Sequence, residues 1–119
     1  MNKKTLGKNG EKLAENFLIK KGFKILQKNF CIRGGEIDII AQEKETIIFI
    51  EVKTRKSKIF GEVIEQISKR QKNKIIKTAM NYLNLNNLSN CHWRIDVITI
   101  FYQTKNYQIN HFKNAIAFF

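Results

Sequence analysis

Apolar side chains recur at helical spacing near the start of the chain, at Leu13, Ala14, Phe17 and Leu18. This stripe predicts an amphipathic helix over about residues 6–21. Gly22 follows the stripe and is typical of a residue that ends a helix. We expect a first strand directly afterwards, near residues 23–30.

Two apolar runs follow within the stretch GGEIDIIAQEKETIIFIEVKTR, which spans residues 34–55. Residues 36–42 and 47–53 alternate or run apolar, as strands do when one or both of their faces are buried. The polar residues EKET between these runs predict a hairpin with one of the longer loops.

The second half of the chain predicts another helix and further strands. After the basic loop RKSKIFGE, apolar residues keep a helical period over about residues 63–85. RIDVITIFY, at residues 94–102, predicts a strand, QTKN predicts a turn, and residues 107–112 predict an edge strand. The order α-β-β-β-α-β-(β) predicts one α/β domain over residues 1–119, built as a sandwich around a mixed sheet.

Three charged residues interrupt the apolar runs of the hairpin, although a buried charge without a partner is costly: Asp38, Glu51 and Lys53. Because side chains alternate between faces, Glu51 and Lys53 share one face of their strand. If Gln42 pairs with Ile47, Asp38 lies opposite Glu51 on the same side of the sheet. A slip of one residue would place them on opposite faces, and we predict the first register.

Two carboxylates placed opposite each other repel and need a positive partner. Lys53 supplies one charge. Mg²⁺, with Mn²⁺ as a substitute, would supply more, because Mg²⁺ binds one or two carboxylates together with waters and phosphate oxygens. Such an ion activates water and stabilises charge on a phosphoryl group. The alternative is a metal-free ion network at the edge of the sheet.

Polar residues on the two predicted helices add to this group. Glu11 lies at the margin of the first helix's apolar stripe, where it either points toward the sheet or lies on the surface. Gly7 and Gly10 fall on the inward side, and small residues there allow a close approach of another backbone. On the second helix, Ser68 and Gln71 share the apolar stripe, which fits either a helix face along a groove or a solvated basic face.

The chain carries 22 Lys and Arg residues against 10 Asp and Glu, a net charge of +12. This balance favours polyanions such as nucleic acid, although a biased nucleotide composition of the gene would also enrich Lys. Candidate nucleic-acid contacts lie in the basic loop and at the start of the second helix: Arg55, Lys56, Lys58, Lys69, Arg70 and Lys72. Without a signal-peptide pattern or an apolar run of ~20 residues, we expect a cytoplasmic protein that is not inserted in a membrane.

Several motifs follow one another along almost the whole chain: GKNGEKLAENFLIKKGFKILQKNF, GGEIDII, IIFIEVKTR, KRQKNKIIKTAMNYL and RIDVITI. In this order and spacing the chain resembles the YraN family of small bacterial proteins, which is similar to Holliday-junction resolvases and the wider PD-(D/E)XK nuclease superfamily. The resemblance implies a restriction-endonuclease-like fold, a three-layer sandwich with helices on both faces of the sheet. The chain departs from the superfamily label at Ile37, which precedes the motif aspartate in place of Pro.

The resemblance also implies a Mg²⁺-dependent DNA endonuclease that hydrolyses phosphodiester bonds, with branched or recombination intermediates as candidate substrates. It implies five catalytic positions, of which the three acids also hold the metal: Glu11, Asp38, Glu51, Lys53 and Gln71, with Lys72 as the alternative to Gln71. Resolvases act as dimers, so the resemblance is compatible with a homodimer.

Two further hypotheses stay open. A nucleic-acid-binding module of the same fold would keep the basic loop and helix and act in repair, recombination or uptake without cleavage. A protein-interaction adaptor would use an exposed apolar tail, AIAFF. Asp96, inside RIDVITI, is expected to pair with Arg94 or to anchor a loop, and His92 and His111 are expected to be structural or surface residues.

Overall fold

The computed structural model describes residues 3–56 and 67–116 of the chain. Within them, two helices and five strands follow the predicted order: α1 (Lys3–Lys20), β1 (Lys24–Ile32), β2 (Gly35–Glu43), β3 (Thr46–Arg55), α2 (Lys69–Leu85), β4 (Trp93–Tyr102) and β5 (Tyr107–Phe112). The predicted basic-loop residue Lys58 lies outside the described residues.

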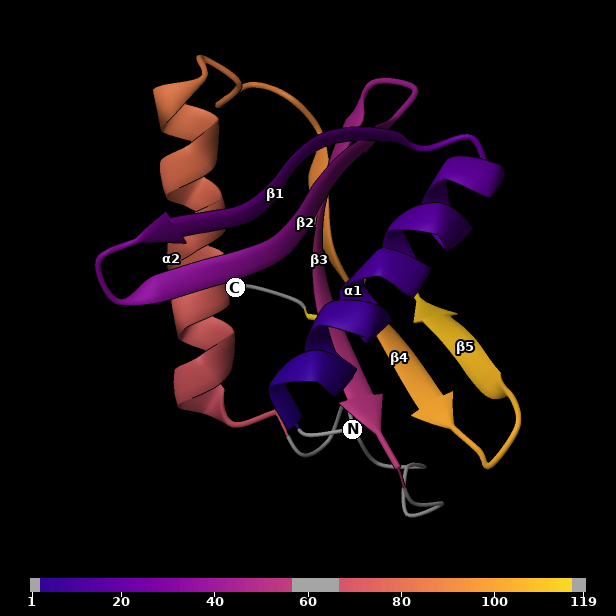
Figure 1. Cartoon of the computed structure of the whole chain (residues 1–119). Coiled ribbons are helices and arrows are strands. Elements are labelled where there is room, and N and C mark those ends of the chain that lie inside the picture. The colour runs from indigo at the N-terminus through magenta and orange to yellow at the C-terminus, as the bar shows by residue number, and fades with distance from the viewer. Residues whose placement is uncertain (1–2, 57–66, 117–119) are drawn as a thin grey trace.

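The five strands form one mixed sheet in the order β1-β2-β3-β4-β5. β3 and β4 run parallel, whereas the other neighbouring strands are antiparallel. A parallel pair requires a crossover connection, and the segment between β3 and β4 contains α2. Figure 1 shows α1 on one face of the sheet and α2 on the other. The α/β class, the mixed sheet and the helices on both of its faces are therefore confirmed.

The β2–β3 hairpin has the predicted register. Gln42 pairs with Ile47, and the backbone ladder continues to Ile39 opposite Ile50. Three successive pairs of this ladder join buried residues, Ile39 with Ile50, Ile40 with Phe49 and Ala41 with Ile48, so both faces of the hairpin lie in a core.

The turn of this hairpin is tighter than predicted. Glu43 pairs with Thr46, so Lys44 and Glu45 alone make the turn and the predicted longer loop is wrong. Lys44 has a φ of 54°, the left-handed conformation that tight hairpin turns require, and neither turn residue is the Gly or Asn that usually indicates such a turn.

The two helices begin and end through different local interactions. Gly22, with a φ of 94°, ends α1, and its N–H donates to the Ile19 carbonyl oxygen, as predicted for this glycine. Ser68 is the N-cap of α2, and its Oγ accepts from the Gln71 backbone N–H at 3.1 Å. The predicted helix start near residue 63 is therefore wrong, because Ile67 and Ser68 precede the helix. Among the described residues, neither helix is long and apolar enough to cross a bilayer.

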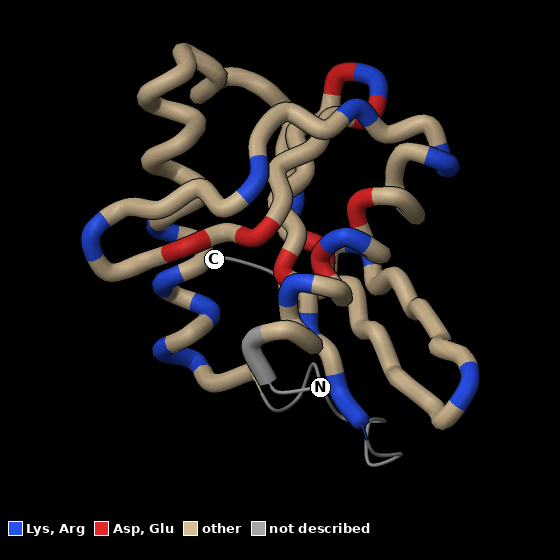
Figure 2. Tube along the Cα trace, viewed as in Figure 1, with Lys and Arg blue, Asp and Glu red and all other residues tan. Residues whose placement is uncertain are grey.

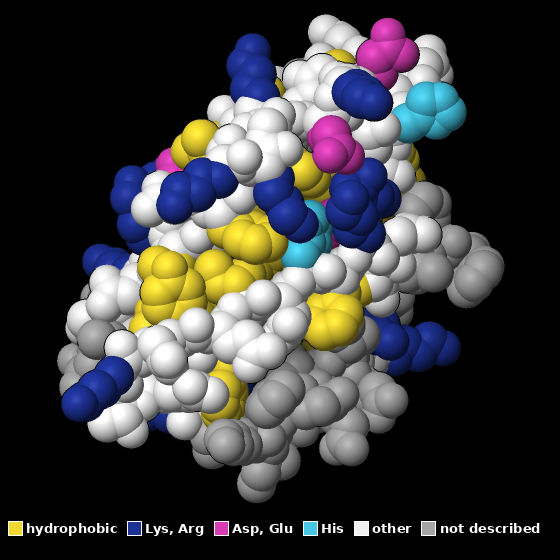
Figure 3. Space-filling model, turned by 90° about the vertical axis from the view of Figure 1, so that its right-hand side faces the viewer, with side chains coloured by type: hydrophobic (Ala, Val, Ile, Leu, Met, Phe, Trp, Pro, Cys, Tyr) yellow, Lys and Arg dark blue, Asp and Glu magenta, His cyan; other side chains and the backbone are white. Residues whose placement is uncertain are grey.

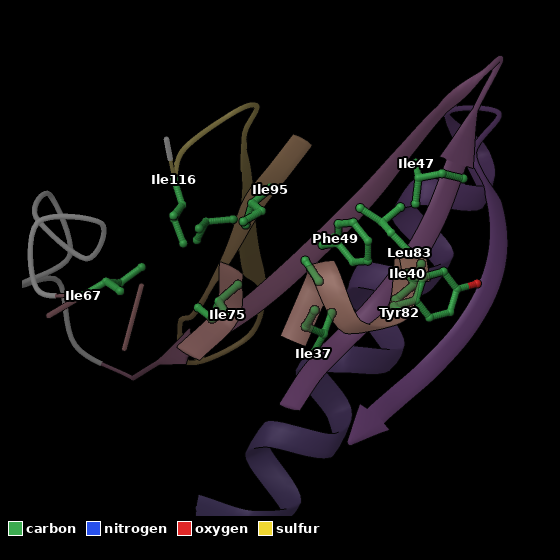
Figure 4. Packing of buried hydrophobic residues seen from close by; sticks show 12 residues of the cluster. Ile37, Ile40, Ile47, Phe49, Ile67, Ile75, Tyr82, Leu83, Ile95 and Ile116 are labelled. Carbon is green, nitrogen blue, oxygen red and sulfur yellow. The ribbon is translucent and has the colours of Figure 1, made fainter. Parts of the chain in front are cut away.

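Hydrophobic side chains form one core on each face of the sheet. The core beneath α2 joins strand and helix residues, shown in Figure 4, and includes Ile37, Phe49, Ile75, Tyr82, Leu83, Ile95 and Ile116. The core beneath α1 includes Ala14, Leu18, Ile39, Ile48, Ile50, Ile98 and Ile100. Ile116 is 1% exposed, so the predicted exposed tail AIAFF is wrong at this residue; Ala115 is partly buried, and residues 117–119 lie outside the described residues.

The alternation of β2 side chains between the two faces of the sheet is interrupted at Asp38. Ile37 packs in the core beneath α2, whereas Ile39 packs beneath α1, although residues two apart share a face in a regular strand. On β1, Asn29 has a φ of 54° between the partners of Ile39 and Ile37. The end of the β1–β2 hairpin therefore bends away from β3 and crosses α2, as Figure 1 shows, and Asp38 lies at the bend.

Candidate functional site

Asp38 lies at the fork where β2 leaves β3. The backbone ladder between the two strands ends at Ile39 opposite Ile50. Beyond it, the Val52 N–H donates a hydrogen bond of 2.8 Å to the Asp38 Oδ2 atom. The carboxylate therefore satisfies a backbone donor that the diverging strand no longer reaches, which gives Asp38 a structural role besides any chemical one.

Glu51 lies beside Asp38, as the predicted register requires. Its side chain is 14% exposed, and Lys53 Nζ lies 3.7 Å from its Oε2 atom. Burial, a hydrogen bond shared with Asp38 and the charge of Asp38 raise the pKa of Glu51 to about 9, although Lys53 acts in the opposite direction. Glu51 therefore keeps its proton at neutral pH, in a hydrogen bond with Asp38, although Lys53 lies beside it.

Glu11 brings a third carboxyl group toward the fork from α1. Burial raises its pKa, and the charges of Asp38 and Glu36 raise it further. A side chain at Gly10 would overlap Thr54 of β3, so this glycine lets α1 approach the strand closely, as predicted. Gly7 has open space around it, so the same prediction is wrong at that position.

The acids of this site are of the residue types that bind divalent cations. No group of three or more His, Cys, Asp or Glu side chains stands at metal-binding spacing within residues 3–56 and 67–116. The pair of Asp38 and Glu51 is nevertheless a donor set of the kind Mg²⁺ uses, because Mg²⁺ takes one or two carboxylates and completes its shell with water and phosphate. The raised pKa of Glu51 indicates that Lys53 does not offset the burial of this acid and its repulsion by Asp38.

Glu51 opens into a cleft of about 780 Å³ between the end of the β1–β2 hairpin and the first turns of α2. Its lining includes acidic, basic and amide side chains: Glu36, Glu51, Ser68, Arg70, Gln71 and Lys74. Of the two candidates for the polar helix position, Gln71 lines the cleft with Glu51, whereas Lys72 is half-buried and does not line it. The exposed Cys31 also lines the cleft.

Basic side chains continue from this cleft along α2. Figure 2 shows basic positions along the N-terminal half of the helix and acidic positions where β2, β3 and α1 pass one another. A shallow hollow of about 470 Å³ is lined by Lys69, Arg70, Asn73, Lys74 and Lys77, all of them exposed. Lys69 and Arg70 thus lie where a polyanion reaching the cleft would pass.

The basic residues at the end of β3 are arranged differently. Arg55 is half-buried, and its Nη1 donates to the Thr54 carbonyl oxygen at 2.8 Å. Lys56 follows it and is exposed. One donor of Arg55 is therefore bound to the neighbouring backbone. Of these two predicted nucleic-acid contacts, Lys56 is the exposed one.

A second polar cluster, which lies beneath α1 and outside the cleft, surrounds the fully buried Asp96. Arg94 Nε lies 3.0 Å from Asp96 Oδ1, His111 Nε2 lies 2.7 Å from Oδ2, and the Asn114 N–H donates to Oδ1 at 2.8 Å. Burial acts to raise the pKa of Asp96, but these hydrogen bonds outweigh it and lower the pKa below its usual range. Asp96 therefore both pairs with Arg94 and anchors the C-terminal segment, as predicted, and His111 has a structural role.

Comparison with other proteins places the chain in a family. Residues 10–100 match the family described as uncharacterised protein family UPF0102. The chain is 47% identical over 115 residues to a UPF0102 protein of Clostridioides difficile, covering 97% of this chain and 99% of that protein. It is 41% identical over 118 residues to a UPF0102 protein of Carboxydothermus hydrogenoformans, covering 99% and 100% of the two chains. The protein therefore belongs to the UPF0102, or YraN, family.

Proposed function

We propose that the protein is a Mg²⁺-dependent endonuclease that hydrolyses phosphodiester bonds in DNA. One observation carries the proposal: Asp38 and Glu51 lie together at a fork of the sheet, the Glu51 carboxyl group lies 3.7 Å from the Lys53 ammonium, and Glu51 lines a cleft bordered by basic side chains. In a structural ion network, acidic side chains normally have basic partners in equal number. Among the described residues, Lys53 is the ion-pair partner of Glu51, and Asp38 lies beside the same group.

Asp38 and Glu51 would hold the Mg²⁺ ion, and Glu11 would complete or orient its shell of water molecules. When bound, the ion activates a water molecule and stabilises charge on the phosphoryl group. Lys53 donates to the phosphoryl oxygens as negative charge accumulates on them, which lowers the barrier to attack by the water oxygen at phosphorus. The water oxygen gives up a proton to bulk solvent as its bond to phosphorus forms, the bond from phosphorus to the leaving sugar oxygen breaks, and that oxygen takes a proton from bulk water.

Gln71 and the basic side chains of α2 position the substrate in this proposal. The Gln71 side chain is a neutral donor and acceptor on the wall of the cleft opposite the acids, where it orients either the phosphate or the attacking water. Arg70 and Lys74 line both the cleft and its outer hollow, so they contact phosphates on either side of the bond that is cut. A genomic DNA substrate is available in the cytoplasm, which is where we propose that the protein acts.

A cleavage assay tests the proposal. Purified protein is incubated with linear duplex, single-stranded and four-way-junction DNA in the presence of Mg²⁺, Mn²⁺ or EDTA. Glu51→Gln and Lys53→Ala are expected to lose activity, whereas Glu45→Gln, an exposed acid in the turn of the same hairpin, keeps it. Cutting that persists in EDTA, or at an equal rate in Glu51→Gln, would exclude this mechanism.

A second candidate function is a nucleic-acid-binding module without cleavage. It is favoured by one observation, the lack of a three-acid cluster at metal-binding spacing among the described residues. In that case Arg70→Ala and Lys74→Ala weaken DNA binding, and no substrate is cut with any metal. The adaptor hypothesis is contradicted at Ile116, which is buried in the core, whereas residues 117–119 of the tail lie outside the described residues.

A further inference from the structure

A second cleft, of about 930 Å³, lies at the opposite end of the sheet from the β2–β3 turn. It is formed where the β4–β5 turn meets the first turns of α1 and the end of β3, and its main lining residues are Leu6, Lys56, Tyr102, Lys105 and Tyr107. None of the described residues that line it is acidic. The cleft therefore combines aromatic and basic side chains without a carboxylate that would repel a phosphate.

The two tyrosines of this cleft form a fixed platform. Tyr102 and Tyr107 stand directly opposite each other in the β4–β5 ladder, with ring centroids 6.4 Å apart and ring planes tilted by 55°. The turn between them is closed by a hydrogen bond of 2.7 Å from the Gln103 N–H to the Asn106 carbonyl oxygen. Tyr107 is 49% exposed, whereas Tyr102 is half-buried, so one ring supports the other and leaves one aromatic surface open.

We propose that this cleft binds an unpaired nucleotide of the DNA strand, with its base stacked on the Tyr107 ring and its phosphate near Lys105 and Lys56. This inference rests on the proposed function and names the substrate class more closely: DNA with a single-stranded segment. An exposed aromatic ring beside lysines is the combination that binds single strands without reading their sequence. A duplex cannot use the ring, because its bases are stacked inside the helix.

The cleft lies within reach of the proposed cutting site along a single strand. β3 carries Lys53 and ends at Arg55, and Lys56 at the border of the cleft is three residues beyond Lys53. Three residues of a strand span about 10 Å, so a strand cut at the fork can place a nearby unpaired nucleotide in the cleft. Figure 3 shows the face of the molecule toward the β4–β5 edge, where hydrophobic side chains are exposed among basic ones.

The test compares the binding of a single-stranded thymidine oligonucleotide with that of a blunt duplex. Tyr107→Ala is expected to weaken single-strand binding by about tenfold, because the base loses its stacking on the aromatic ring, and to leave duplex binding unchanged. Tyr107→Phe keeps the ring and is expected to bind like the wild type. Phe112→Ala removes an exposed ring from the other end of β5 and is the matched control.

A second readout locates the base. An oligonucleotide carrying 5-iododeoxyuridine is expected to cross-link on illumination to a peptide that contains Tyr107. Free thymidine monophosphate is expected not to compete with the oligonucleotide for this cross-link when both are present at equal nucleotide concentration. An equal loss of single-strand and duplex binding in Tyr107→Ala, an unchanged affinity, or an equal effect of Phe112→Ala would overturn this inference while leaving the nuclease proposal intact. A protein that binds no DNA in either form would overturn both.

Discussion

The carboxylate of Asp38 accepts a hydrogen bond of 2.8 Å from the Val52 N–H at the point where β2 leaves β3. This contact explains how an acid is accommodated between two strands that are apolar on either side of the fork. The bend at residues 37–39 leaves a backbone donor without a partner on the neighbouring strand, and the side chain at the bend supplies the acceptor. The same arrangement holds Asp38 beside Glu51, so the fold and the proposed metal site depend on one residue.

Removing the acceptor of Asp38 is expected to destabilise the protein more than removing its charge. Asp38→Ala leaves the Val52 N–H without a partner and is expected to lower the free energy of unfolding by about 1–3 kcal/mol. Asp38→Asn keeps an acceptor oxygen and removes the repulsion with Glu51, so its loss should be smaller. Urea denaturation of both variants measures the difference, and equal losses would show that the hydrogen bond has no structural role.

The stability of the metal-free protein is expected to fall as the pH rises. The pKa of Glu51 is about 9 in the folded chain against an ordinary value of 4.5, so the folded state binds more protons than the unfolded state between these values. The stability contributed by Glu51 is therefore fully present below about pH 4.5 and is lost as the pH rises to about 9, whereas the lowered pKa of Asp96 makes its own contribution fall at acidic pH. Thermal unfolding in EDTA measures this trend.

Glu51→Gln tests the origin of the pH trend. The variant cannot ionise at this position, so its loss of stability between about pH 5 and pH 9 is expected to be smaller than that of the wild type, and it should be the more stable protein at pH 8. Glu45→Gln, which replaces an exposed acid, should follow the wild type. A Glu51→Gln curve parallel to the wild-type curve would mean that Glu51 titrates normally.

The thiol of Cys31 reports whether DNA occupies the cleft. Cys31 is exposed and lines the cleft with Glu51, whereas Cys91 is only partly exposed and packs beside the core beneath α2. Maleimide labelling is therefore expected to be faster at Cys31, and DNA is expected to slow labelling at Cys31 several-fold without changing that at Cys91. Mass spectrometry separates the two sites, and equal rates at Cys31 with and without DNA would place the bound DNA elsewhere.

The buried cluster around Asp96 is expected to contribute to stability and not to DNA cutting. Asp96→Ala leaves the charge of Arg94 and the buried His111 without their partner, and should cost about 3–5 kcal/mol. Glu43→Gln removes the other, more exposed partner of Arg94, at 3.6 Å, and should cost less than about 1 kcal/mol. Chemical denaturation of the two variants makes the comparison, and a similar small cost in both would contradict the role assigned to the cluster.

The sequence predicts the elements of this fold well where apolar spacing is regular. The predicted pairing of Gln42 with Ile47 is confirmed, and a slip of one residue would have placed Asp38 and Glu51 on opposite faces of the sheet. The predicted start of α2 is too early because Ile67 fits the helical spacing of apolar residues. The helix begins at Lys69, after the N-cap residue Ser68. Apolar spacing alone does not reveal which polar residue leaves the pattern to cap a backbone group.

Features that depend on contacts between distant residues are not predicted by the spacing of residue types along the chain. Ile37 and Ile39 read as one face of a strand, and only the bend shared with β1 places them on opposite cores. The contact of Asp96 with His111 spans 15 residues and requires the pairing of β4 with β5. The tyrosine platform arises in the same way, because Tyr102 and Tyr107 become neighbours only when the turn between them closes.

Calorimetric titration of Mg²⁺ and Mn²⁺ at pH 8 is the most direct test that Asp38 and Glu51 form a cation site. The wild type is expected to bind one ion per chain and to release protons from the pair, so that the measured heat depends on the ionisation enthalpy of the buffer. Glu45→Gln should behave in the same way, whereas Asp38→Asn and Glu51→Gln should lose both the binding and the buffer dependence. Saturable binding that is unchanged in Glu51→Gln, or no binding by the wild type with either ion, would contradict the account.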